Sequence, residues 1–257
     1  MESHPTPPSE PAEETPAAEV DSAAEESTSP KESSNLQFLA ALIFLAVVLV
    51  IVVLWVMTML APSWYTPPAA DDAVAADLAQ QAEFGLVENL QKIREPGEPW
   101  RLRISDEAVN AWLGIRMAKW LAHEGHPPWP EYLGIPQVHT TPSGIIVAIA
   151  LTSDSGVGRV LGLQVAPEIG EESMHLSIVG GLLGRLPIPS PPGSLLEMVR
   201  NAATDGDGAS VLAVDYLIDG ADFPSVVELV DGRIVQFDDV QLEDGAFILV
   251  ARTLPRP

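Results

Sequence analysis

The stretch "QVHTTPSGIIVAIAL", residues 137–151, is the point at which the chain changes from a helical to a strand-like pattern. Its two halves are apolar or alternate with a period of two, which is typical of β-strands. Between them, Pro142, Ser143 and Gly144 are residue types that form tight turns. The stretch therefore predicts two antiparallel strands joined by a turn.

Strand patterns continue to the end of the chain. They are "GRVLGLQVAPEI" (158–169), "SMHLSIVGG" (173–181), "SVLAVDYLIDG" (210–220), "SVVELVDG" (225–232), "RIVQFDDVQLEDG" (233–245) and "AFILVART" (246–253). Asp-Gly pairs at 219–220, 231–232 and 244–245 mark turns between them. Because strands joined by short turns pair antiparallel, these segments predict a mostly antiparallel sheet.

Helical patterns precede the strands. Residues 71–97 begin with two aspartates suited to a helix N-terminus and stop at Pro96 and Gly97. A short strand follows, and Ser105 then serves as the N-cap of a second helix. The apolar face expected for this single helix consists of Val109, Trp112, Leu113, Trp120 and Leu121.

An uncharged apolar run lies upstream of both helices. Residues 38–61, "FLAALIFLAVVLVIVVLWVMTMLA", are long enough for a helix to cross a bilayer. Trp64 and Tyr65 follow at the level that aromatic rings prefer in membranes. The alternative is a cleaved signal peptide, but the run is too long, its upstream flank is acidic and no small-residue cleavage site follows directly. We therefore expect a single-pass transmembrane helix.

The first 35 residues are rich in Glu, Pro, Ala, Ser and Thr. They carry nine acidic residues against one basic residue, Lys31, a net charge of −8. Such a composition cannot bury enough apolar surface to fold, so it predicts a disordered tail. Lys31 is the only basic residue near either end of the apolar run, and Asp71 and Asp72 lie beyond its other end. This asymmetry favours a cytoplasmic tail and an extracytoplasmic domain at the cell membrane.

These patterns divide the chain into four parts. They are a disordered acidic tail (1–35), a transmembrane helix (36–61), a juxtamembrane linker and helix (62–98) and an extracytoplasmic α+β domain (99–257). The predicted fold class is α+β, in which a single transmembrane helix is followed by a long, curved, mostly antiparallel sheet packed on one or two helices.

The sequence lacks the residues that nucleic-acid binding, metal binding and several kinds of catalysis require. The 196 residues after the apolar run carry 27 acidic and 12 basic side chains, a net charge of −15, which disfavours nucleic acid as a partner. The chain has no cysteine, and "HEGH" (123–126) spaces its histidines one residue too closely for a zinc-protease helix. "TDGDGAS" (204–210) would place Val214 where a calcium loop needs glutamate. We expect no metal, no cofactor and no enzymatic activity.

The stretch "GGLLGRLPIPSPPGSLLEMV", residues 180–199, mixes apolar and chain-breaking residues. Its glycines permit a bend, and its prolines cannot donate to a sheet, so part of it should be an edge or extended segment. A short helix capped by Ser190 or Ser194 should follow. The hypothesis is that its side chains line a ligand-binding wall; the alternative is that they only close the core. The residues concerned are Leu182, Leu183, Leu186, Ile188, Leu195, Leu196 and Val199.

The order of these segments resembles that of the YpmS-type membrane-anchored envelope proteins and, more distantly, the tubular lipid-binding (TULIP-like) folds. An N-terminal anchor precedes "ISDEAVNAWL" (104–113), strands with a glycine turn, "LLGRLPIPSPPGSLLEMV" (182–199) and "VDGRIVQFDDVQL" (230–242). The resemblance covers roughly residues 100–250. It implies a curved sheet that wraps a helix and leaves an apolar groove for acyl chains, with residues 182–199 as one wall.

The sequence thus predicts a membrane-anchored, non-catalytic domain that binds a lipid or other hydrophobic ligand. The alternative is a structural or interaction protein of the cell envelope that docks a protein partner. An apolar cavity open at one end would favour the first function, and a fully packed core with an apolar exterior patch would favour the second.

Overall fold

The computed structural model describes residues 31–123, 125, 128–130, 132–151, 158–170, 173–189, 193, 197 and 221–255. The strand predicted at 210–220 lies outside these residues, and so does the helix predicted after Ser190. The chain forms two compact units, Met1–Val47 and Val48–Pro257. The division falls inside the first helix, so the second unit includes the last part of that helix.

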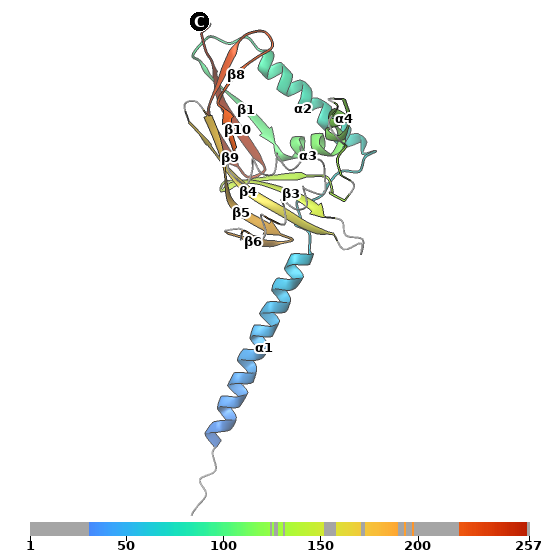
Figure 1. Cartoon of the computed structure of the whole chain (residues 1–257), viewed down its shortest axis with the longest axis vertical. Helices are drawn as coiled ribbons and strands as arrows, with labels where there is room; N and C mark the ends of the chain where they lie inside the picture. Colours follow the sequence, from blue (N-terminus) through green and yellow to red (C-terminus); the bar gives the residue numbers. More distant parts are fainter. Residues whose placement is uncertain are drawn as a thin grey trace, which may run out of the picture. The chain divides into compact units, whose positions relative to one another are not determined.

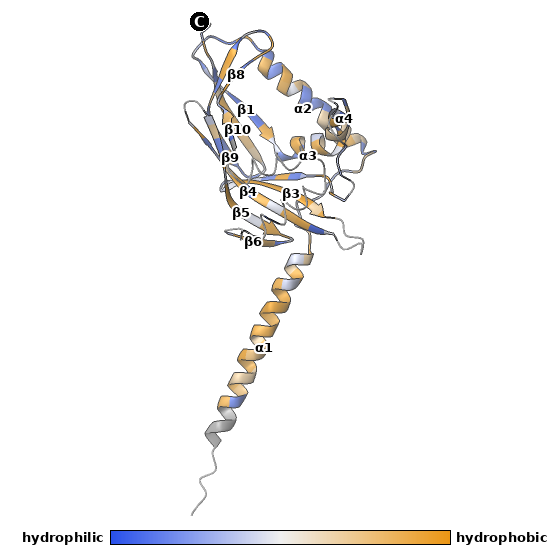
Figure 2. Ribbon diagram, viewed as in Figure 1, coloured by the Kyte–Doolittle hydropathy of each residue, from blue (hydrophilic) through white to orange (hydrophobic). Residues whose placement is uncertain are grey.

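Helix α1 (Lys31–Met59) contains the predicted apolar run except for its last two residues, 60 and 61. Its segment Leu36–Met59 has 24 residues, about 36 Å of helix at 1.5 Å per residue, and is long and apolar enough to cross a membrane. In Figure 2 the ribbon of this helix is coloured as hydrophobic over most of its length. The helix begins at Lys31, five residues before the expected boundary, because extending a helix that is already formed costs little.

Ten strands form two hydrogen-bonded sheets, and every pairing between described strands is antiparallel (Figure 1). The four-stranded sheet has the order β1 (Pro99–Ser105), β10 (Ala246–Thr253), β9 (Ile234–Glu243), β8 (Val226–Glu228). The six-stranded sheet has the order β2 (Gln137–Thr141), β3 (Gly144–Leu151), β4 (Arg159–Ile169), β5 (Ser173–Leu183), β6 (Leu186–Ile188), and β7 (Ala221–Pro224) also pairs with β5.

The two sheets are continuous at one corner. Strand β7 pairs with β5, and β8, which follows one residue later, pairs with β9. The residue between them, Ser225, is fully buried, and its carbonyl accepts a hydrogen bond from the amide of Phe237. The chain therefore passes from one sheet to the other at Ser225, as strands do at the corners of curled sheets. The result is a half-barrel of antiparallel strands with helices, which confirms the predicted α+β fold class.

The two faces of the four-stranded sheet differ in polarity. Trp100, Leu102, Val235 and Ala251 are buried together on one face. The opposite face carries paired charges, with Arg252 and Asp238 2.6 Å apart and Arg103 and Glu243 3.3 Å apart. This alternation along the strands is what the period-two pattern predicted.

Helices α2 (Ala73–Gln91) and α3 (Asp106–Ile115) lie against each other. Asp72 and Ser105 cap them, as expected, by accepting hydrogen bonds from first-turn amides. Their contact is built from small side chains, Ala75, Ala79 and Ala111, with Ile115. Small side chains allow two helices to approach closely, which explains why alanines occupy this contact.

The single helix expected over residues 105–121 was wrong, because α3 ends at Ile115 and α4 (Met117–His123) follows separately. Gly114 weakens the last turn of α3, and a Cβ there would overlap the ring of Pro68. The predicted apolar face holds only in part, since Trp112 packs against the contact between α2 and α3. Trp120 belongs to α4 and is 47% exposed, while the smaller Ala111 is buried against α2.

Candidate functional site

The predicted wall residues lie on the hairpin of β5 and β6, where strand alternation divides them. Leu182 shares one face of the six-stranded sheet with Gly162. Leu183, Leu186 and Ile188 lie on the opposite face. Leu183 and Leu186 are direct cross-strand partners, and all three side chains are half-buried. Leu195, Leu196 and Val199 lie outside the described residues, so the structure brings together three of the seven.

Strand β5 is distorted near Gly180 and Gly181, but these glycines do not end the strand as the sequence suggested. Gly180 and Gly181 lie inside β5, which continues to Leu183. The strand is distorted by a bulge at Val179, since Gly180 pairs with Gln164 and Ile178 with Val165. Proline-containing β6 is the edge strand of this sheet, as predicted.

The turn between β5 and β6 binds the end of α1. The backbone amide of Arg185 donates to the carbonyl of Met57 at 2.8 Å, and its Nε donates to the carbonyl of Ala61 at 2.8 Å. Met57 lies in the last turn of α1, where carbonyls have no intrahelical donor, and Ala61 lies two residues past the end of the helix. Gly184 has φ +58°, and a Cβ there would lie 2.5 Å from the carbonyl oxygens of Met57 and Thr58. Glycine is therefore required at this contact for both conformation and space.

A cavity of about 470 Å³ lies among the linker after α1, the N-terminal part of α2, α3 and β2. Apolar side chains form much of its lining, among them Trp64, Pro68, Val74, Leu78 and Val138. Its polar lining includes Asp106, Asn110 and His139. Its volume lies in the range of small-molecule sites, and polar or charged residues make up nearly half of its lining.

Asp106 is the most buried carboxylate of this cavity. Its Oδ2 accepts a hydrogen bond from the Thr140 amide at 2.7 Å, and its Oδ1 accepts one from the Thr140 hydroxyl at 2.5 Å. Nδ1 of His139 lies 3.4 Å from Oδ2. The ring of His139 stacks on Trp64, with 5.0 Å between centroids. The carboxylate, the imidazole and the indole thus form a continuous polar-to-aromatic surface.

Asn110, one turn after Asp106, pairs with β2 in the way a neighbouring strand would. Its amide nitrogen donates to the carbonyl of Val138 at 2.8 Å, and its Oδ1 accepts from the Val138 amide at 2.6 Å. The Thr140 carbonyl accepts from the amide of Gly245, in the turn between β9 and β10. Helix α3 and this turn therefore provide hydrogen-bond partners for backbone groups on the outer edge of β2. The turn also links the two sheets at a second place.

Tyr65 fixes the linker on the six-stranded sheet. Its hydroxyl donates to the carbonyl of Ile135 at 2.8 Å and accepts from the amide of Ala150 at 2.9 Å. The ring packs with Ala148 and Val160. Burial raises the pKa of the Tyr65 phenol above its ordinary value, because the charged form would lose hydration.

Replacing Tyr65 by phenylalanine should lower the free energy of unfolding by about 1–3 kcal/mol, because two partly buried backbone groups lose their partner. The raised pKa predicts a second effect. The folded state holds the phenol proton more tightly than the unfolded state, so the parent should lose stability as pH rises above about 10. Urea unfolding at neutral and alkaline pH measures both effects. The alkaline loss should be smaller in Tyr65→Phe, and equal losses in both proteins would contradict this account.

Sequence reasoning missed the centre of this cavity. Neither Asp106 nor His139 was among the candidate site residues that the sequence patterns indicated. The available signal was the spacing of Asp106 and Asn110, which places two hydrogen-bonding side chains on one side of a helix. Among the described residues, no three His, Asp or Glu side chains are grouped so that they could hold a metal ion.

Comparisons with known proteins do not name a family. No family model matches the chain, and no curated protein shows a significant match.

Proposed function

We propose that this chain is a single-pass membrane protein whose domain binds a lipid or other hydrophobic ligand and catalyses no reaction. The observation that carries the proposal is the cavity of about 470 Å³, which is lined by both apolar and polar residues. An amphipathic molecule fits such a lining, with its apolar part against Leu78 and Val138 and its polar group at Asp106 and His139.

The location of the cavity supports a ligand supplied by the membrane. Trp64, Thr66 and Pro68 line it, and they follow the apolar helix by only a few residues. A lipid leaving the bilayer would therefore meet this cavity close to the membrane surface. We assign the domain to the extracytoplasmic side of the cell membrane and the acidic tail to the cytoplasm, since Lys31 is the only basic residue near either end of the span.

The hairpin residues predicted from sequence provide a second apolar surface. Leu183, Leu186 and Ile188 share a sheet face with Val147, which is 38% exposed. A sheet face with exposed valine and half-buried leucines retains apolar area that a ligand could cover. We retain these residues, with Leu182, as candidate contacts for the apolar part of a ligand.

The test uses bulky substitutions at two leucines of α2. Leu78 lines the cavity, whereas Leu86 lies two turns later on the same helix and is 42% exposed. The full chain is purified in detergent, washed free of loosely held lipid and analysed by native mass spectrometry. The parent and Leu86→Trp should retain a bound lipidic molecule, and Leu78→Trp should retain less of it because the larger indole occupies part of the cavity. Equal retention in all three proteins would exclude the cavity as the site.

Charged substitutions on the hairpin separate the two apolar surfaces. Leu186→Glu and Ile188→Glu should leave the domain folded, because half-buried side chains can direct a carboxylate to water. If the ligand extends over this face, both variants should lose it in the same measurement. Folded variants with unchanged ligand would show that the hairpin face is not part of the site. Unfolding would show that these residues close the core, since a buried unpaired charge costs several kcal/mol.

The second candidate function, docking of a protein partner, is favoured by a different observation. Phe84 on α2 is 64% exposed, and Val87 on the same helix is also exposed. Exposed aromatic side chains of this kind are frequent at protein interfaces. If the purified parent carries no lipidic molecule, this candidate becomes the better one. Loss of a crosslinked partner in Phe84→Ser would then support it.

A further inference from the structure

We propose that Arg159 and Arg185 form a phosphate-binding edge through which the domain binds the lipid headgroups around its own membrane helix. The partner is thus a lipid surface and not the ligand of the cavity. The inference requires α1 to span a bilayer, but it does not depend on what the cavity holds.

Arg185 is placed at headgroup level by its hydrogen bonds. Its amide and Nε bind the carbonyls of Met57 and Ala61, which lie where the apolar helix ends. The side chain is exposed, and within the described residues its two terminal nitrogens make no hydrogen bond or ion pair. A guanidinium in this state keeps its charge and two donor groups for a phosphate.

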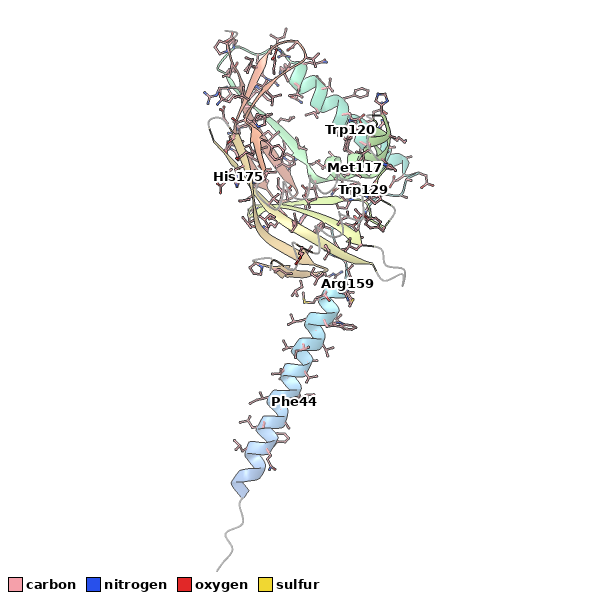
Figure 3. The ribbon with its side chains drawn as sticks, in the orientation of Figure 1. Phe44, Met117, Trp120, Trp129, Arg159 and His175 are labelled. Carbon is pink, nitrogen blue, oxygen red and sulfur yellow. The ribbon has the colours of Figure 1, made fainter. Side chains whose placement is uncertain are left out.

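Arg159 lies beside this turn. It is the first residue of β4, and the carbonyl of the next residue, Val160, accepts a hydrogen bond from the amide of Gly184. Arg159 is exposed, and no carboxylate in the described part of the chain pairs with it. Figure 3 shows Arg159 beside the C-terminal end of α1. Two arginines that have no acidic partner among the described residues therefore lie on the edge that contacts the helix end.

This edge differs from the surface of the four-stranded sheet. There, Arg103 and Arg252 pair with Glu243 and Asp238, and Arg233, just before β9, pairs with Asp231. Arg101 of β1 is exposed and has no acidic partner among the described residues, but no second arginine of this kind lies opposite it in the strand register. The domain as a whole is strongly acidic, so two adjacent arginines without a described acidic partner are an exception that a neighbouring anion would explain. Each basic side chain close to an anionic membrane surface strengthens the binding of the protein to that surface by about fivefold.

The sequence contains no cysteine, so one introduced cysteine can carry a unique label. Pro187 of β6 is exposed and adjacent to the turn. Pro187→Cys in the full chain, labelled with a fluorophore, is reconstituted in nanodiscs of phosphatidylcholine and phosphatidylglycerol with a headgroup nitroxide lipid as quencher. A label at Val230→Cys, a fully exposed position next to β8, gives the reference quenching.

The decisive variant is Arg159→Gln, because Arg159 makes no hydrogen bond to α1. Quenching at position 187 gives the equilibrium constant between the state in which the β5–β6 turn contacts the headgroups and the state in which it does not. This constant should fall about fivefold in Arg159→Gln. It should fall further when Arg185→Gln is added, and recover in Arg159→Lys. Arg101→Gln is the matched control, because Arg101 is also exposed and is a strand arginine of the other sheet.

Quenching that is unchanged in Arg159→Gln, or equally reduced in Arg101→Gln, would overturn the proposal. Thermal unfolding followed by circular dichroism checks that every variant remains folded. High salt should reduce the quenching of the parent and have little effect on the double variant, because screening acts on the same charges. A loss caused by disruption of the fold would appear in the unfolding curve and would not respond to Arg159→Lys. Failure of this test would leave the lipid-retention test of the cavity unaffected.

Discussion

Deletion of residues 36–61 is expected to move the protein from the carbonate-resistant membrane pellet to the soluble fraction. The segment Leu36–Met59 is a helix with no charged residue, and its side chains are largely exposed. Figure 3 shows Phe44 projecting from this helix. Each large apolar side chain contributes roughly 1.5–3 kcal/mol when it leaves water, so the sum over the helix makes insertion effectively irreversible.

Deletion of residues 1–30 is the matched control, because it removes slightly more residues and none of the apolar span. This variant should stay in the carbonate-resistant pellet. Sedimentation after alkaline carbonate extraction, followed by immunoblotting, separates the two outcomes. An intact product beginning near residue 62 in the soluble fraction of normal cells would instead show that the helix is a cleaved signal.

Replacement of Asp106 by alanine should lower the free energy of unfolding by about 2–4 kcal/mol, the largest effect expected for a single substitution in the domain. Thr140 is fully buried, and Asp106 accepts hydrogen bonds from both its amide and its hydroxyl. Without the carboxylate, two buried donors would lose their acceptor. The outer edge of β2 would also lose one of the contacts that hold it to α3.

Glu107→Ala is the control for Asp106→Ala, because Glu107 lies in the same helical turn and is exposed. It should change stability by less than about 0.5 kcal/mol. Thr140→Val should cost about 1 kcal/mol by removing one hydroxyl, and the double variant should cost less than the sum of the single ones. Urea unfolding of the full chain in detergent gives all four values. Strict additivity would contradict a direct interaction between the two side chains.

Local sequence patterns predicted a helix or strand correctly where its hydrophobic period and its capping or turn residues are enough to determine it. The apolar run became α1, Asp72 and Ser105 became the caps of α2 and α3, and the turn at Gly144 joins β2 to β3. These outcomes depend on side chains close in sequence, such as a carboxylate accepting from amides two and three residues ahead.

Prediction failed where a distant segment changes the local outcome. The helix expected over residues 105–121 divides near Gly114, where Pro68 of the linker packs closely. The wall expected from residues 182–188 divides between two faces, because these residues form paired strands and strand side chains alternate. Neither the packing of Pro68 nor the register of β5 and β6 is encoded by periodicity alone.

By itself, the sequence determined the apolar helix, the α+β class and the antiparallel pairing, because hydrophobic period, chain length and turn chemistry are local properties. Only the tertiary structure decided that the turn at Gly184 and Arg185 binds the end of α1, and that Asp106 and His139 meet at Trp64. These contacts join residues 33 to more than 120 positions apart. They exist because the sheet curls, and the direction of that curl depends on strand register and on the passage through Ser225.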